Sequence, residues 1–336
     1  MHPVEALRRI AFLLERAHEP TYRVRAFRSA AAAVEALSAE ELDRRVREGT
    51  LRELRGIGEA TATVVTEAAR GELPAYLAKL HGAASGPVTA GGAALRAALR
   101  GDCHTHSDWS DGGSPVREMA EAARALGLEY QVLTDHSPRL TVANGLSADR
   151  LRAQLDVVAG LNEELAPFRI LTGIEVDILD DGALDQDEEL LGQLDVVVAS
   201  VHSKLRMDHD AMTRRMITAV ANPHTDILGH CTGRLLTGRG RPESDFDAEL
   251  VFEACRQFGV AVEINSRPER LDPPKRLLRL AQEAGCMFAI DTDAHAPGQL
   301  DWAPYGCERA EAVGIGADRV INTGSADQLL AWTASG

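Results

Sequence analysis

The 336-residue chain has few cysteines and no long apolar run. Its five cysteines are scattered, odd in number and form no Cys-x-x-Cys pair, which argues against a disulfide framework and against a thiolate zinc site. No run of about 18 apolar residues occurs, so the sequence predicts no transmembrane helix and no membrane partner. The first residues mix acidic and basic side chains and lack the apolar segment of a signal peptide. We therefore expect a cytoplasmic protein with reduced thiols.

The net charge of −15 would by itself argue against nucleic acid as a partner. The charge is uneven, however, because residues 1–100 hold 15 Lys and Arg against 12 Asp and Glu, whereas the remainder holds 21 against 39. The first part of the chain is thus mildly basic and the larger part strongly acidic. This asymmetry predicts that the two parts bind different partners.

Apolar residues at helical spacing predict helices over residues 3–18 and 22–37. Two further helix starts are predicted by pairs with the form of a capping box, Ser38 with Glu41 and Thr50 with Glu53.

A Gly56-Ile57-Gly58 turn follows, and a helical pattern over residues 61–70 comes after it. Backbone amides left open at the start of that helix would suit a nucleic-acid phosphate. The match Leu51-x-x-Leu54-x-Gly56-Ile57-Gly58-x-x-x-Ala62 resembles the helix-hairpin-helix DNA-binding motif. We therefore predict DNA contacts at Gly56, Ile57 and Gly58, the alternative being a tight turn between packed helices.

Small residues dominate residues 81–98, which predicts a linker between an all-α domain at 1–80 and a second domain at 99–336. In the second domain apolar strands alternate with helical patterns, which predicts a parallel sheet and, with this many units, a closed or distorted barrel. The expected strands are 101–104, 129–134, 169–175, 195–201, 226–230, 259–264, 286–291 and 319–322. The helices expected between them include 115–126, 147–164, 246–258 and 275–284.

Metal-ligating side chains follow nearly every expected strand, at the end where barrel enzymes place their chemistry. Six of the eleven histidines and three carboxylates are in these places: His104, His106, Asp111, His136, Glu175, His202, His230, Asp293 and His295. One such histidine alone would be unremarkable, but nine residues at successive strand ends are hard to explain as packing. Nine ligands exceed the needs of one ion, and several divalent ions would leave a positive pocket suited to phosphate. Mixed nitrogen and oxygen ligands without thiolate suit zinc, manganese or iron.

Polar and basic residues in the same loops are candidates to bind substrate phosphate. They are Lys204, Arg234, Asn265 and Arg267. Each arginine and lysine is equally consistent with an ordinary solvated surface charge.

The ligand pattern resembles the PHP (polymerase and histidinol phosphatase) family. The likeness rests on His104-x-His106, Ser110-Asp111-Gly, Thr134-Asp-His136, Glu175, His202, His230 and Asp293-x-His295. The sequence is most similar to the C-terminal PHP domain of bacterial family X DNA polymerases. Tyr22-Arg-Val-Arg-Ala-Phe-Arg28 and Gly56-Ile-Gly58 extend the likeness to their N-terminal module.

The resemblance implies a distorted (β/α)7 barrel and three divalent metal ions (Zn, Mn or Fe). In the implied arrangement, the first ion is bound by His104, His106, Glu175 and Asp293. Glu175 also bridges to a second ion, which is bound by His202 and His230. The third ion is bound by Asp111, His136 and His295. It also implies removal of 3′ nucleotides or 3′ phosphates from DNA, and cleavage at abasic sites as a further activity. The implied partner is DNA with ends, nicks or gaps, bound through the N-terminal module.

One departure from the family X polymerases is the short connection between Lys79 and Gly101, about twenty residues where those enzymes carry their catalytic palm. We therefore predict no polymerase activity. Two alternatives stay open: a small-molecule phosphatase such as histidinol-phosphate phosphatase, and a non-catalytic DNA-binding scaffold. The sequence leaves the oligomeric state open.

Overall fold

The computed structural model describes residues 1–84 and 86–335 and divides the chain into two compact units, Met1–Pro87 and Val88–Gly336. The division lies within the predicted linker. Among the described residues no helix is long and apolar enough to cross a membrane.

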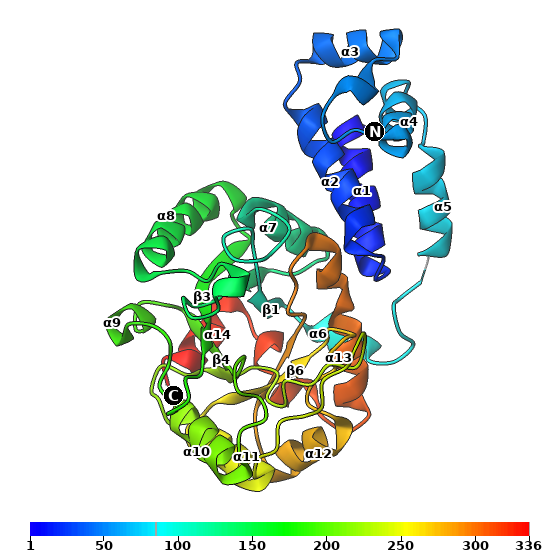
Figure 1. The fold of residues 1–336 in the computed structure, drawn as a ribbon. Helices are drawn as coiled ribbons and strands as arrows, with labels where there is room; N and C mark the ends of the chain where they lie inside the picture. Colours follow the sequence, from blue (N-terminus) through cyan, green and yellow to red (C-terminus); the bar gives the residue numbers. More distant parts are fainter. Residues whose placement is uncertain (85, 336) are drawn as a thin grey trace. The chain divides into compact units, whose positions relative to one another are not determined.

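The first unit is all-α, as predicted (Figure 1). Its core is lined by apolar residues that recur at helical spacing, such as Leu7 and Ile10 on one helix and Val64 and Ala68 on another. The helices are α1 (Pro3–Arg16), α2 (Thr21–Glu35), α3 (Ala39–Glu48), the 3-10 helix η1 (Leu51–Glu53), α4 (Glu59–Ala69) and α5 (Ala75–Ala83).

One of the two predicted capping pairs is wrong. The Ser38 hydroxyl accepts a hydrogen bond from the Glu41 amide at 3.2 Å, as an N-cap does, and so begins α3. The Thr50 side chain makes no capping hydrogen bond, and the segment after it is the single 3-10 turn η1. This turn leads directly into the Gly56–Gly58 turn, so too few residues remain for an α-helix there.

The second unit is a barrel of seven parallel strands in sequential order, surrounded by helices (Figure 1). The strands are β1 (Gly101–Thr105), β2 (Tyr130–Leu133), β3 (Arg169–Asp177), β4 (Val196–Ser200), β5 (Ile227–Leu228), β6 (Ala261–Asn265) and β7 (Phe288–Asp291). The helices are α6 (Ala93–Ala98), α7 (Val116–Ala125), α8 (Ala148–Leu165), α9 (Glu188–Leu191), α10 (His209–Val220), α11 (Ala248–Gln257), α12 (Lys275–Ala284), α13 (Ala303–Glu311) and α14 (Ala326–Thr333), with 3-10 turns η2 (Thr141–Ala143), η3 (Pro297–Trp302), η4 (Ala317–Arg319) and η5 (Ile321–Thr323).

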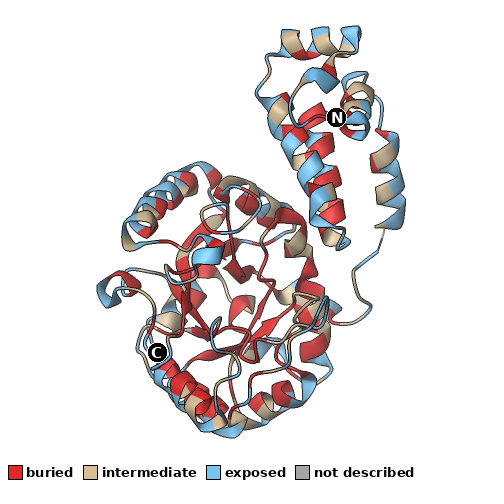
Figure 2. Ribbon diagram, viewed as in Figure 1, coloured by how far each residue is buried: buried red, intermediate tan, exposed pale blue. Residues whose placement is uncertain are grey.

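The barrel is nearly closed between its first and last strands. The Cys103 amide donates to the Asp291 carboxylate at 2.8 Å, and the His106 amide donates to the Ala294 carbonyl at 2.8 Å. The strands are buried except at Arg169 and Thr172 of β3, and the surrounding helices turn their buried sides inward (Figure 2). Because all strands run the same way, their carboxyl ends meet at one rim.

The expected strand at 319–322 is wrong. Arg319 ends η4, Ile321 and Asn322 begin η5, and Val320 between the two turns makes a single bridge to the sheet, opposite Phe288. The Asn322 side chain occupies the position where strand hydrogen bonds would form, because its Nδ2 donates to the Gly101 carbonyl at 3.0 Å and to the Ile290 carbonyl at 2.8 Å. The segment thus links β1 to β7 through hydrogen bonds of the Asn322 side chain.

Part of the predicted linker is helical. Residues 93–98 form α6, because Leu95 and Leu99 are buried in the core of the second unit.

Candidate active site

The rim at the carboxyl ends of the strands gathers all nine predicted ligand residues. His104 is the fourth residue of β1 and His106 follows the strand, so the two side chains fall on the same side two residues apart. The β1–β2 register shifts between Asp102 and Thr105, at the position of His104. Glu175 lies within β3, and the other six residues lie in the loops after β1, β2, β4, β5 and β7.

Glu175 is at the centre of this group, 1% exposed and surrounded by imidazole rings. Its Oε2 lies 3.2 Å from His104 Nε2 and 2.9 Å from His136 Nδ1. Its Oε1 lies 3.1 Å from His202 Nε2 and 2.8 Å from His230 Nε2. Burial alone would raise the pKa of the Glu175 carboxyl, but the surrounding histidines hold this pKa well below its usual range.

A second cluster adjoins the first and includes the loop after β1. Asp111 Oδ1 lies 3.5 Å from His136 Nε2 and 3.3 Å from His295 Nε2. Asp293 joins both clusters, because its Oδ1 is 3.4 Å from His106 Nε2 and 3.5 Å from His295 Nδ1. Three sets of ligand atoms lie within 4.8 Å of one another: His106, Asp111, His136 and His295; His104, His106 and Glu175; His136, Glu175 and His202.

The Gly56–Gly58 turn of the first unit differs from the expectation in its hydrogen bonds. The Ile57 amide donates to the Leu54 carbonyl at 3.2 Å, and the Gly58 amide donates to Thr61 Oγ1 at 2.9 Å. The Ile57 side chain is buried and packs in the helical core, so its role is structural.

Open amides do occur beside this turn, in the first turn of α4. Those of Glu59 and Ala60 have no acceptor within residues 1–84 and 86–335. The open amides therefore lie one or two residues after the predicted Gly56–Gly58 contacts, at the start of α4.

Comparison with known proteins identifies both units. The family model described as a helix-hairpin-helix domain matches residues 1–72, and the PHP domain model matches residues 102–267. A probable phosphatase of Thermoanaerobacter sp. is 32% identical over 233 residues, which cover 66% of this chain and 89% of that protein. This chain belongs to the PHP family of phosphoric-ester hydrolases.

A longer relative matches this chain over part of its own length. The DNA polymerase/3′-5′ exonuclease PolX of Bacillus subtilis is 42% identical over 234 residues, which cover 70% of this chain. The present PHP protein spans only 41% of the length of that relative. Among solved structures, histidinol phosphate phosphatase from Lactococcus lactis, complexed with zinc, L-histidinol and phosphate, is similar with a TM-score of 0.46 and 18% identity, covering 65% of this chain and 95% of that one.

The cluster of this PHP protein fits a metal centre. Four buried atoms lie close together yet have no hydrogen-bond partner among the described residues: His104 Nε2, His106 Nε2, His202 Nε2 and Glu175 Oε2. Buried polar atoms are normally paired, so such a group needs another partner. Imidazole nitrogens and a carboxylate oxygen that converge without hydrogen-bond geometry are what a divalent cation requires.

Two of the four predicted phosphate contacts have other partners. Lys204 pairs with Asp180 and its side chain is 65% exposed. The Arg234 guanidinium donates to the Arg270 carbonyl at 3.0 Å and to the Leu271 carbonyl, so it braces the loop after β6. In both cases the direction of the side chain is set by a loop that the sequence pattern did not describe.

Asn265 and Arg267 do lie against the cluster. Asn265 is fully buried, and its Nδ2 is 3.2 Å from Asp293 Oδ2, so it holds that carboxylate in place. Arg267 Nη1 donates to the Asp293 carbonyl at 2.7 Å and lies 2.9 Å from His295 Nδ1. Arg270 is a further neighbour, with its Nε 3.2 Å from Asp293 Oδ2. Burial alone would raise the pKa of the Asp293 carboxyl, but Arg267 and the His106 ring hold it well below its usual range.

Two carboxylates that the sequence analysis did not propose orient the histidines. Glu263 Oε1 lies 2.6 Å from His104 Nδ1, and Asp177 Oδ1 lies 3.0 Å from His202 Nδ1. A carboxylate that accepts the Nδ1 proton leaves the Nε2 lone pair of each ring free for a metal. The sequence did hold a signal, because Glu263 is an isolated charge in an apolar strand, two residues before Asn265.

We predict that Glu263→Gln lowers metal affinity by about 10- to 100-fold, the usual range for such carboxylates. An amide can donate to Nδ1 as well as accept from it, so the favoured His104 tautomer is no longer fixed. Metal content after dialysis against graded chelator measures the effect. Glu253→Gln, on the outside of α11 and paired with Arg256, is the matched control and should bind metal as the unaltered chain does. Equal affinity for the Glu263→Gln and Glu253→Gln proteins would contradict the orienting role.

Proposed function

We propose that this PHP protein is a metal-dependent phosphoesterase that processes the 3′ ends of DNA in repair, as a 3′-5′ exonuclease or 3′-phosphatase and at abasic sites, without polymerase activity. One observation carries the proposal: a cluster of nine possible metal ligands is joined in one chain to a helix-hairpin-helix unit. A substrate with a scissile phosphoester and a long phosphate backbone would contact the metal cluster with the first and the helix-hairpin-helix unit with the second. A cytoplasmic location is part of the proposal.

The nine rim residues would hold three divalent ions. In our assignment His104, His106, Glu175 and Asp293 hold the first, Glu175 with His202 and His230 the second, and Asp111, His136 and His295 the third. Ions in these places would lower the pKa of water and neutralise charge that develops on a phosphoester during hydrolysis.

The chain's own cations would orient the phosphate. Arg270 Nη1 is buried and has no hydrogen-bond partner among the described residues, while its Nε contacts Asp293. A buried guanidinium N–H beside the cluster would donate to a phosphate oxygen, and Arg267 would add a second positive charge. We assign binding of the substrate phosphate to Arg267 and Arg270, and we assign no substrate contact to Lys204 and Arg234.

The first unit would hold the DNA backbone. The open amides of Glu59 and Ala60 and the positive end of the α4 dipole suit a phosphate. Gly58 lets that phosphate approach, because a side chain at this position would extend into open space on the surface. This unit holds 13 Lys and Arg against 12 Asp and Glu, so its net charge does not repel a polyanion as that of the acidic barrel does.

A substrate screen tests the proposal. Metal-loaded protein would be compared on DNA with a 3′-terminal nucleotide, DNA with a 3′ phosphate, DNA with an abasic site, histidinol phosphate and an aryl phosphate. We expect the highest kcat/KM on a DNA substrate. A kcat/KM for a small ester that exceeds the kcat/KM for every DNA substrate would favour the alternative, a small-molecule phosphatase. The Thermoanaerobacter relative supports this alternative, because its match of 233 residues is about as long as the barrel unit and covers 89% of that protein. Failure to hydrolyse any ester with metal bound would favour a non-catalytic scaffold.

We also predict that the chain does not extend a primer. The two compact units adjoin at residues 87 and 88, which leaves no separate nucleotidyl-transfer domain between them. Incubation with a primed template and all four deoxynucleotides should give no longer product, with the Bacillus polymerase as positive control. Templated extension by protein free of other polymerases would contradict the prediction.

A further inference from the structure

The second unit has a cavity at the end of the barrel opposite the metal-binding rim. Asp195 directly precedes β4 and Asp226 directly precedes β5, whereas His202 and His230 follow these same strands. The two carboxylates therefore stand at the amino ends of strands whose carboxyl ends supply ligands to the rim. The cavity is thus separate from the site described above.

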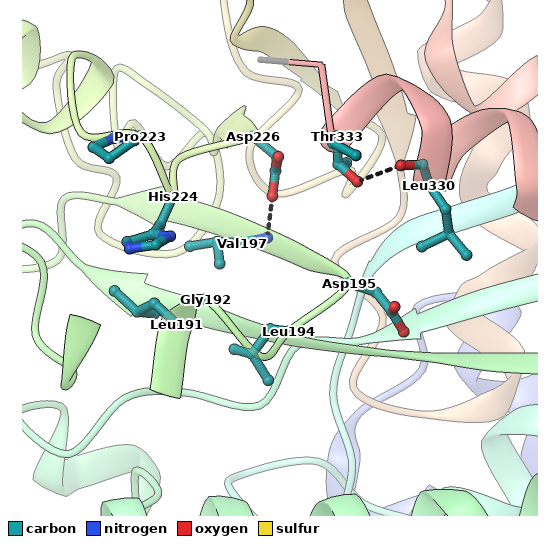
Figure 3. Close-up of a pocket in the computed structure, with 11 residues that line it drawn as sticks. Leu191, Gly192, Leu194, Asp195, Val197, Pro223, His224, Asp226, Leu330 and Thr333 are labelled. Atoms are coloured by element: carbon teal, nitrogen blue, oxygen red, sulfur yellow. Dashed lines mark hydrogen bonds between the residues drawn. The ribbon is translucent and has the colours of Figure 1, made fainter. Parts of the chain in front are cut away.

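This cavity has a volume of about 320 Å³ and lies between the loops before β4 and β5 and the C-terminal helix α14 (Figure 3). Its walls combine aliphatic side chains with a few polar groups. The lining includes Leu191, Leu194, Val197, Leu330, His224 and Thr333, together with the two aspartates.

Asp226 is a half-buried carboxylate, and no positive side chain among the described residues offsets its charge. One of its oxygens accepts a hydrogen bond from the Val197 amide at 2.7 Å, drawn in Figure 3. Burial raises the pKa of Asp226 to about 7, and within the described chain no Lys or Arg counteracts this. Asp195 is held in a similar way, since one oxygen accepts from the Thr172 amide at 2.8 Å and from its hydroxyl at 2.9 Å.

A second hollow of about 240 Å³ adjoins the first and shares Pro223, Asp226 and Thr333 with it. The residues that line it include the aromatic residues Phe258 and Trp332. Phe258 is 47% exposed, which is unusual for a residue of its size. The two hollows, together called the groove below, share Asp226, and aliphatic residues line the first whereas Phe258 and Trp332 line the second.

We propose that this groove binds an aliphatic diamine or polyamine. An ammonium group would pair with Asp226, the methylene chain would lie along the apolar walls, and a further ammonium would face Asp195 or the ring of Phe258. Ammonium groups are attracted by aromatic faces as well as by carboxylates. The chemistry disfavours an anion, because neither hollow is lined by a described Lys or Arg.

A bare metal ion fits less well than an organic cation. Asp195, His224 and Asp226 are not among the described groups whose ligand atoms lie within 4.8 Å of one another. Metal ligands must converge to about 2.0–2.2 Å from one point. A chain with separated charges can instead reach carboxylates that stand apart.

Isothermal titration of the metal-loaded full chain with spermidine tests the proposal. We expect saturable binding of one molecule per chain, and at least about tenfold weaker binding by Asp226→Asn, because a charge-assisted pair is lost. The asparagine oxygen can still accept from the Val197 amide, so the fold should be kept. Asp156→Asn removes the same charge from the exposed surface of α8 and should leave the affinity unchanged. Butylamine, with one ammonium group, should bind more weakly than spermidine.

A second variant keeps the test decisive if Asp226→Asn does not fold. Phe258→Ala removes an exposed ring and should weaken spermidine binding without disturbing the core. Absence of saturable binding to the unaltered chain would overturn the proposal. Equal affinities for the unaltered, Asp156→Asn and Phe258→Ala proteins would also overturn it, since they would indicate attraction to the overall negative charge alone.

Discussion

Replacing both His104 and His106 with alanine should lower the metal content of the purified protein by at least one ion per chain and abolish phosphoester hydrolysis. Both rings are fully buried against Glu175, with Nε2 atoms 3.2 Å and 3.5 Å from its Oε2. Without them, Glu175 and Asp293 remain as carboxylates too few to hold an ion in that part of the cluster. Elemental analysis gives the metal content, and hydrolysis of an aryl phosphate gives the activity.

The matched control is the double variant His81→Ala and His209→Ala. His81 is on α5, and His209 begins α10 and contacts Asp245, so both lie outside the cluster. This control should keep full metal content and activity, which separates the loss of ligands from the loss of any two histidines. Circular dichroism shows whether the test variant is folded. Unchanged metal content in a folded His104→Ala, His106→Ala protein would refute the assignment of these ligands.

The placement of the nine cluster residues could be predicted because it depends on topology. In a parallel barrel every strand delivers its carboxyl end to the same rim, so the position of a residue after a strand is enough to place it. His202 and His230 are 28 positions apart in sequence, and both lie within 3.1 Å of a Glu175 oxygen. Strand periodicity carried that information without any knowledge of side-chain conformation.

Features that depend on side-chain direction could not be predicted in the same way. Arg234 and Arg267 both follow strands of the rim, yet one braces backbone carbonyls and the other approaches His295. The segment 319–322 has the composition of a strand, but Asn322 pairs with Gly101 and Ile290 through its side chain. In each case the position of the side chain is set by a hydrogen bond to a residue far away in the sequence. Such a bond cannot be predicted from sequence spacing.

The hairpin of the first unit shows the same limit. The Gly-Ile-Gly pattern located the turn, but the Gly58 amide is taken by Thr61 Oγ1. The amides that stay open belong to Glu59 and Ala60, which the pattern does not mark. In the expected DNA contact, Gly58 would therefore act by letting a phosphate come close to the α4 amides, and its own N–H group would not bind the phosphate.

Deleting the first compact unit, residues 1–87, should leave hydrolysis of an aryl phosphate nearly intact and sharply reduce activity on duplex DNA ends. The aryl ester needs only the rim, and the rim residues all lie within Val88–Gly336. The remaining barrel is strongly acidic and should repel a polyanion outside its metal cluster. Its activity on DNA should also depend less steeply on salt, because phosphate contacts have been removed.

A point variant makes the same test within the full chain. Gly58 has φ −97°, and no atom lies within 4 Å of the position that a Cβ would take there, so leucine fits without backbone strain while it blocks the approach to the α4 amides. Gly82→Leu, equally open and on α5 of the same unit, is the matched control. We expect Gly58→Leu to raise KM for DNA ends by several-fold and to leave kcat for the aryl phosphate unchanged, with Gly82→Leu altering neither. If the truncated barrel and the Gly58→Leu protein both degrade DNA as well as the full chain, the first unit does not hold the substrate, and its open amides serve another anion.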